Sequence, residues 1–189
     1  MKLGLIGFEQ AGKATIYEAL TGAELSPGAR VESQIGTLRV PDERVDILSR
    51  LYNPRKTIYA QVEYFLPAGQ PQGREKRSGE QPYWTLVRDC DALIHCVRNF
   101  ALFGSQAPTP LEDYRRLDQE LIFEDLIVVE KRLERLALDQ KRGKKPDPEE
   151  QSLLERCKAS LEDERPLRDT PELARAHKLR GFAFLSAKP

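Results

Sequence analysis

The stretch GFEQAGKA, residues 7–14, lies between a short apolar run and a helical pattern, and it decides the expected fold. Its two glycines and its lysine have the Gly-x-x-x-x-Gly-Lys spacing of a phosphate-binding loop. Glycines leave backbone N–H groups free to surround phosphate oxygens at the positive end of the next helix. A glycine-containing turn with an exposed lysine is the simpler alternative. The predicted phosphate-binding residues are Gly7, Gln10, Ala11, Gly12, Lys13, Ala14 and Thr15.

Apolar periodicity around this loop predicts an α/β domain. Short apolar or alternating runs predict strands at residues 2–6, 35–40, 58–66, 92–97 and 181–185. Residues 42–52 predict a helix with Val45, Leu48 and Leu51 on one face, and a further helix is expected around Trp84. Residues 67–82 combine glycine, proline and charge, which predicts a mobile loop.

The second half of the chain predicts an inserted helical arm. Turn residues are scarce between residues 111 and 142, and an apolar stripe there steps by four, three, four and three residues. After a loop at 142–148 the stripe returns, which predicts an antiparallel coiled-coil hairpin over residues 111–170. The nucleotide domain would then comprise residues 1–110 and 171–189, and an ordinary helical subdomain is the alternative. The stripe residues are Ile122, Leu126, Val129, Leu133 and Leu136, then Leu154, Cys157 and Leu161.

Composition argues against several classes of protein for this chain. Among 189 residues, 30 basic and 30 acidic side chains cancel, so no net field favours DNA or an anionic membrane. No apolar run reaches the roughly 18 residues of a membrane span, and no signal peptide is expected, which favours a cytoplasmic location. Cys90, Cys96 and Cys157 are expected to be reduced core thiols, and His95 a sheet residue. Neighbouring strand residues face opposite sides, which argues against a metal site at His95 and Cys96.

Four blocks, in order, carry a family resemblance. They are residues 7–22, 35–56 (IGTLRVPDERVDILSRLYNPRK), 91–100 (DALIHCVRNF) and 120–136 (ELIFEDLIVVEKRLERL). Together they resemble the YchF/Obg-like subgroup of translation-factor-related GTPases over nearly the whole chain. The resemblance implies a Ras-like P-loop NTPase domain with a helical coiled-coil insertion, a purine nucleotide as ligand, and the ribosome or another macromolecule as partner of the arm. It also implies a base-recognition strand and a C-terminal domain after an A-K-P turn, which here is Ala187, Lys188 and Pro189.

Three departures from the family concern magnesium. Ala14 stands where the family has a serine hydroxyl, and Thr15 lies about 100° further around the helix. Leu66 stands where the family has an aspartate, and residues 23–33 lack the family's first-switch block. We therefore predict no metal ligand, no catalytic residue, no tightly bound cofactor and at most weak magnesium with the nucleotide.

Three functions remain open on these residues. The first is a protein of this class that binds GTP or ATP, or a phosphate anion, with little or no hydrolysis. The alternative is a pseudo-GTPase that binds no nucleotide and contacts a macromolecule. A competent NTPase with unusual ligands is the third. Lys13 favours the first over the second, and Ala14 and Leu66 count against the third.

Overall fold

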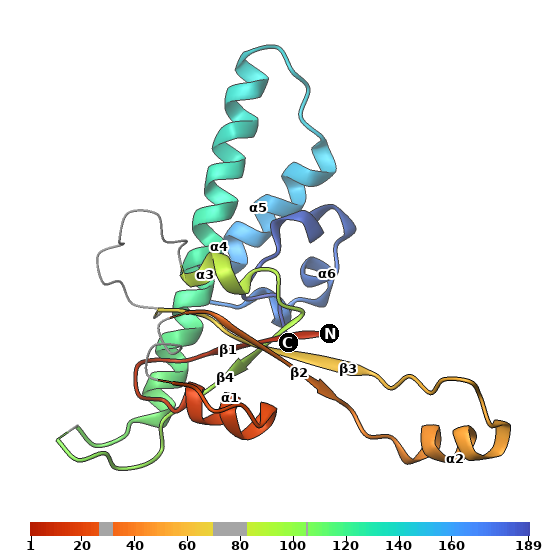
Figure 1. The fold of residues 1–189 in the computed structure, drawn as a ribbon. Coiled ribbons are helices and arrows are strands. Elements are labelled where there is room, and N and C mark those ends of the chain that lie inside the picture. The colour runs from red at the N-terminus through yellow and green to blue at the C-terminus, as the bar shows by residue number, and fades with distance from the viewer. Residues whose placement is uncertain (27–31, 70–82, 105) are drawn as a thin grey trace.

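The computed structural model describes residues 1–26, 32–69, 83–104 and 106–189, and a four-stranded sheet lies at its centre (Figure 1). β1 (Lys2–Ile6) lies between β3 (Gln61–Leu66) and β4 (Ala92–His95) and is parallel to both. β2 (Gln34–Arg39) is an edge strand antiparallel to β3. The predicted α/β class is confirmed. Most of the predicted loop at 67–82 lies outside the described residues, and so does part of the segment 23–33.

Helices cover both faces of the sheet because successive strand residues point to opposite sides. Leu5 packs on one face with Tyr17 of α1 (Lys13–Thr21), whereas Ile6 packs on the other with Trp84 of α3 (Tyr83–Val87). The first turns of the long helix α4 (Pro110–Lys141) join the second face through Leu117. The strand–loop–helix order at the N-terminus and the helix near Trp84 are as predicted.

The helical hairpin is confirmed. α4 and α5 (Pro148–Glu162) stand out from the sheet and lie side by side (Figure 1). The predicted stripe of α4 packs against Leu154, Cys157 and Leu161 of α5. Arg132 of α4 also donates to both carboxylate oxygens of Glu150, at 2.7 and 3.0 Å. The domain boundaries at residues 111 and 170 stay predictions, as does the coiled coil.

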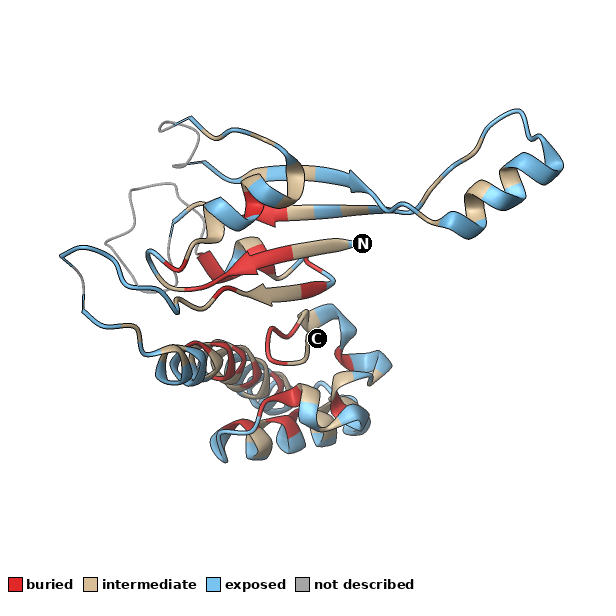
Figure 2. Ribbon diagram, turned by 90° about the horizontal axis from the view of Figure 1, so that it is seen from below, coloured by how far each residue is buried: buried red, intermediate tan, exposed pale blue. Residues whose placement is uncertain are grey.

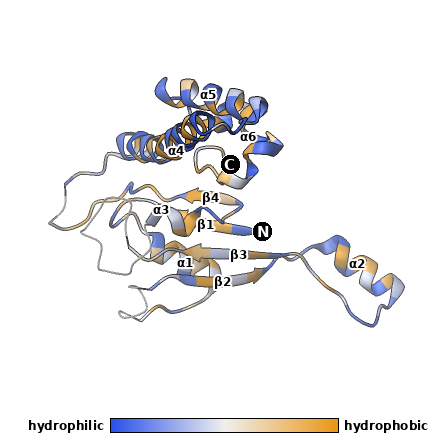
Figure 3. Cartoon of the chain, turned by 90° about the horizontal axis from the view of Figure 1, so that it is seen from above, coloured by the Kyte–Doolittle hydropathy of each residue, from blue (hydrophilic) through white to orange (hydrophobic). Residues whose placement is uncertain are grey.

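α2 (Glu43–Tyr52) forms as predicted, with Asp42 accepting from the backbone N–H of Arg44 at its start. The expected apolar face, however, buries nothing: no residue of α2 is buried (Figure 2). The helix lies at the far end of the β2–β3 connection, away from the core, and carries apolar residues there (Figure 3). Leu48 and Leu51 are 53% and 71% exposed.

The predicted strand at 181–185 is wrong. Residues His177–Phe182 form a 3₁₀ helix instead, after α6 (Pro171–Ala174) and the 3₁₀ turn Leu167–Asp169. The physical reason is Asp125 of α4, a fully buried carboxylate that accepts from the backbone N–H groups of Leu185 and Ser186 at 2.9 and 2.7 Å. A side chain thus satisfies donors that a strand would offer to a neighbouring strand.

The three cysteines are buried and unpaired, as expected. Burial raises the pKa of Cys96 and of Cys157 to about 11, which keeps both thiols protonated at neutral pH. None of the described helices is long and apolar enough to cross a membrane.

Candidate functional site

The loop between β1 and α1 requires glycine at two points. Gly7 has φ 153°, and a Cβ on it would lie only 2.4 Å from the carbonyl oxygen of Cys96 at the end of β4. Gly12 has φ 88° and caps the start of α1, where any Cβ would meet only the Phe100 ring at 4.0 Å. Packing requires the first glycine, whereas backbone conformation requires the second.

Lys13 folds back over the loop that precedes it. Its Nζ donates to the carbonyl oxygens of Gly7 and Phe8, at 2.6 and 2.9 Å. Burial lowers the pKa of Lys13 below its ordinary 10.5, although Cys96 and Glu9 act in the opposite direction. The ammonium therefore lies at the mouth of the loop, in contact with two acceptors that an incoming phosphate could replace.

The other predicted loop residues differ in position. Ala11 is buried in the apolar cluster under α1, and Ala14 packs against the edge of that cluster. Gln10 is exposed with φ 61°, a left-handed conformation uncommon outside glycine. Thr15 is exposed on the outer side of the helix. The structure thus brings Gly7, Gly12 and Lys13 together, and places Thr15 away from Ala14.

The positions where the resemblance implies magnesium ligands are apolar here. Leu66 is 6% exposed and packs in one cluster with Leu5, Tyr17 and Cys96, beside the methyl group of Ala14. Magnesium requires oxygen ligands, and neither side chain supplies one. Among the described residues, no group of three or more His, Cys, Asp and Glu side chains could hold a metal ion. The donor set does not fit magnesium.

His95 behaves as the predicted sheet residue. Its ring stacks on Tyr114 of α4, with centroids 5.2 Å apart, on the side of β4 away from α1. Burial lowers its pKa below the ordinary 6.5, so the ring is neutral at physiological pH. Its Nε2 is buried without a hydrogen-bond partner in the described part of the chain.

Sequence reasoning missed the roles of two residues at the loop, Phe8 within it and Arg116 beside it. The Phe8 ring packs against the core cluster that contains Ile6 and Trp84. The guanidinium carbon of Arg116 lies 5.4 Å from the centre of that ring. More than one hundred positions separate them in the chain, so no local motif could link them. Only the course of α4 back across the sheet brings Arg116 to the loop.

Comparisons with known proteins agree with this fold. The chain is 31% identical to the "Ribosome-binding ATPase YchF" of Bacillus subtilis, covering 98% of this chain and 54% of the relative. It is 30% identical to the YchF of Escherichia coli O157:H7, over 100% of this chain and 54% of the relative. The solved structure of the Schizosaccharomyces pombe YchF GTPase matches with a TM-score of 0.72 at 26% identity, over 100% of this chain and 55% of that one. No family model matches. The chain thus spans about half the length of these relatives.

Proposed function

The chain belongs to the YchF-like subgroup of P-loop GTPases, and from this we propose that it binds the phosphates of a purine nucleotide and hydrolyses them little or not at all. One observation supports the proposal: Lys13 lies over the phosphate loop, and an apolar cluster lies directly beside it. This cluster contains Ala14 and Leu66, the two positions where the resemblance implies magnesium ligands. The loop supports binding, and the cluster opposes hydrolysis. Activity, substrate and partners are proposals for this chain, since its relatives are about twice as long.

Binding requires only what the loop retains. Backbone N–H groups at the positive end of α1 attract phosphate oxygens, and Lys13 contributes a full charge. An incoming phosphate would replace the carbonyl oxygens of Gly7 and Phe8 as the partners of the ammonium. This exchange involves no metal.

Hydrolysis requires more. Phosphoryl transfer depends on positioning and on neutralising the charge that spreads over the transferring group, and magnesium ordinarily supplies much of that charge. Ala14 and Leu66 offer a methyl group and an isobutyl group at the two implied ligand positions. Thr15 is no substitute, because it is exposed on another side of α1.

Calorimetric titration tests the proposal. ADP, GDP, ATP and GTP are titrated into the folded chain with magnesium and with EDTA, and phosphate release is followed in parallel. We expect binding that changes little with magnesium, is mostly lost in Lys13→Ala and is retained in Thr15→Ala, with negligible turnover. A magnesium effect above about tenfold that disappears in Thr15→Ala would refute it. The absence of any nucleotide or phosphate binding at low salt would favour the interaction module.

A second candidate function is contact with a ribosome, the partner named for the bacterial relatives. The observation that favours it is the hairpin tip. Lys141, Arg142, Lys144 and Lys145 are all exposed there, at the end farthest from the sheet (Figure 1). Clustered lysine and arginine attract nucleic-acid phosphates in a salt-dependent way. The cytoplasmic location expected from the sequence accords with such a partner and stays a prediction.

Cosedimentation with bacterial ribosomes tests this second function. The chain should pellet with ribosomes at low salt and be released as salt rises. The double variant Arg142→Glu, Lys145→Glu should pellet less than Arg156→Glu, which alters an exposed arginine of α5 away from the tip. Equal pelleting of the two variants would refute a role for the tip.

A further inference from the structure

Arg116, in the second turn of α4, lies beside the phosphate loop and contacts the ring of Phe8. Its guanidinium carbon is 5.4 Å from the centre of the Phe8 ring, a weak cation–π contact. The side chain is exposed, and within the described ranges it has no ion pair or hydrogen bond. All five of its N–H donors are therefore free for a ligand.

The contact places Arg116 at one particular end of the loop. In Gly-x-x-x-x-Gly-Lys loops the backbone amides hold the inner phosphates, and the lysine reaches the outer ones. Here the Lys13 ammonium lies on the carbonyl oxygens of Gly7 and Phe8, so the Phe8 side of the loop is the outer-phosphate end. The ammonium and the guanidinium both contact Phe8, the first at its carbonyl oxygen and the second at its ring.

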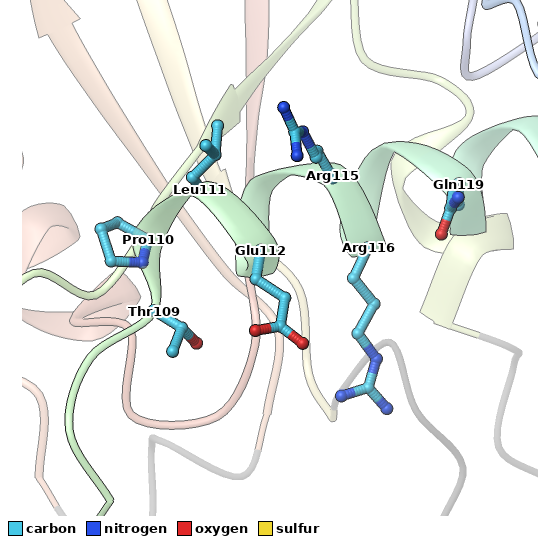
Figure 4. Close-up of a pocket in the computed structure, with 7 residues that line it drawn as sticks. All are labelled: Thr109, Pro110, Leu111, Glu112, Arg115, Arg116 and Gln119. Carbon is cyan, nitrogen blue, oxygen red and sulfur yellow. The ribbon is translucent and has the colours of Figure 1, made fainter.

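An open hollow along the start of α4 gives Arg116 room to move. It has a volume of about 820 Å³, and its described lining residues all belong to α4 or to Thr109 just before it, none of them to the phosphate loop. Glu112, Arg115 and Arg116 are among its lining residues. Arg116 and Glu112 extend to the same side of the helix, and Arg115 extends to the other (Figure 4).

We propose that Arg116 binds the terminal phosphate of a nucleoside triphosphate held in the loop, which rests on the proposed function that the loop binds nucleotide phosphates. A guanidinium can form two parallel hydrogen bonds to one phosphate group. Its permanent charge replaces part of the neutralisation that magnesium ligands would otherwise organise. The ligand class is thus a metal-free nucleoside triphosphate, bound in preference to the diphosphate.

Glu112 is expected to weaken the binding of a terminal phosphate by Arg116. It lies four residues before Arg116, on the same side of the helix and in the same cavity, where it competes for the guanidinium and repels phosphate. The two side chains form no ion pair in the structure as described. Removing the charge of Glu112 should therefore strengthen triphosphate binding, a change opposite in sign to the loss of Arg116.

The test is the ratio of ATP to ADP affinity, and of GTP to GDP affinity, measured by calorimetry in EDTA. Because a ratio is compared within each variant, partial unfolding cancels. Arg116→Ala should lower the ratio by about tenfold or more, as for the loss of a charged hydrogen bond. Arg115→Ala removes the same charge one position away and should leave the ratio unchanged. Glu112→Gln should raise it, and Arg116→Lys should restore part of it.

The outcomes separate this inference from the proposed function. A wild-type chain that binds no nucleotide refutes the function itself. If the wild-type chain binds but Arg116→Ala leaves the ratio unchanged, or Arg115→Ala lowers it equally, the assignment of Arg116 is wrong and the phosphate loop stands without it.

Discussion

Replacing Asp125 by alanine should strongly destabilise the fold, because this side chain of α4 accepts from donors on two other segments of the chain. The carboxylate is fully buried and accepts from the backbone N–H groups of Leu185 and Ser186 and from Arg88 at 3.0 Å. Asp125→Ala would leave two buried backbone donors without their acceptor. It would also remove the carboxylate partner of the Arg88 guanidinium, which keeps its weaker bonds to the carbonyl oxygens of Glu124 and Ala183. Breaking a buried charged network of this kind costs about 3–5 kcal/mol, a large part of a total stability of about 5–15 kcal/mol.

Urea denaturation measures this loss through Trp84, the single tryptophan, which is 4% exposed beneath α4. With a slope of about 2 kcal/mol per molar urea, the midpoint should fall by roughly 2 M. Asp118→Ala is the matched control, since Asp118 lies on the same helix and pairs with Arg168 at 2.6 Å while remaining 20% exposed. It should cost about 1 kcal/mol or less.

Two results would refute this account of Asp125. One is a loss below about 1 kcal/mol, and the other is a loss no larger than that of Asp118→Ala. If Asp125→Ala does not fold, Asp125→Asn takes its place, because the amide keeps one acceptor oxygen and should lose about half as much stability.

Three further predictions use the same structure. Gly7→Ala should destabilise the fold by more than about 2 kcal/mol, because the new Cβ would lie 2.4 Å from a carbonyl oxygen. Gly143→Ala has open space around it at φ 84° and should cost only the roughly 1–2 kcal/mol of a left-handed residue. Urea denaturation of the two variants compares these losses. Leu154→Ala, in the fully buried hairpin core, should cost about 2–5 kcal/mol, and Leu51→Ala, 71% exposed, less than about 0.5; equal losses would contradict the burial pattern. Phosphate affinity should fall as pH rises toward 10.5, because only the charged form of Lys13 attracts an anion. The fall should begin below 10.5, since burial lowers the pKa of Lys13. Lys13→Arg should remove this pH dependence, and an affinity that calorimetry finds constant with pH in the wild type would contradict the prediction.

The sequence predicted the elements whose pattern is local. The loop at 7–13, the helix at 43–52 and the two helices of the hairpin each follow from spacing and turn residues within one segment. The strand predicted at 181–185 failed because its apolar residues resemble a buried strand, while the partner of its backbone, Asp125, lies sixty positions earlier. The apolar stripe of α2 misled in another way, because periodicity shows that a face exists and not that anything covers it.

In the candidate site, too, residues set by a local motif were predictable and residues set by tertiary contacts were not. Gly7, Gly12 and Lys13 were predicted because phosphate binding by backbone amides would require them at fixed spacing, and their role in binding stays a prediction. The Cys96 carbonyl that requires a glycine at position 7 and the guanidinium of Arg116 could not be predicted, because both reach the loop through the tertiary fold. Leu66 falls between these cases. Its position was inferred from the resemblance, and its packing with Leu5 and Tyr17 explains how the fold tolerates an apolar residue there.

α4 connects the two places where function is proposed. Its second turn carries Arg116 beside the phosphate loop, and Leu117 and Leu121 pack on the sheet. The stripe that packs against α5 begins in the middle of the helix, at Ile122, and extends to Leu136. A helix of 32 residues is about 48 Å long, and no proline interrupts it after Pro110. A ligand that draws Arg116 toward the loop therefore acts on the same continuous helix that ends at the basic tip. Triphosphate binding and ribosome contact affect each other only if α4 has two orientations and the triphosphate binds one of them more tightly. Measuring ribosome cosedimentation with and without ATP in EDTA, in wild type and in Arg116→Ala, separates a rigid helix from a coupled one.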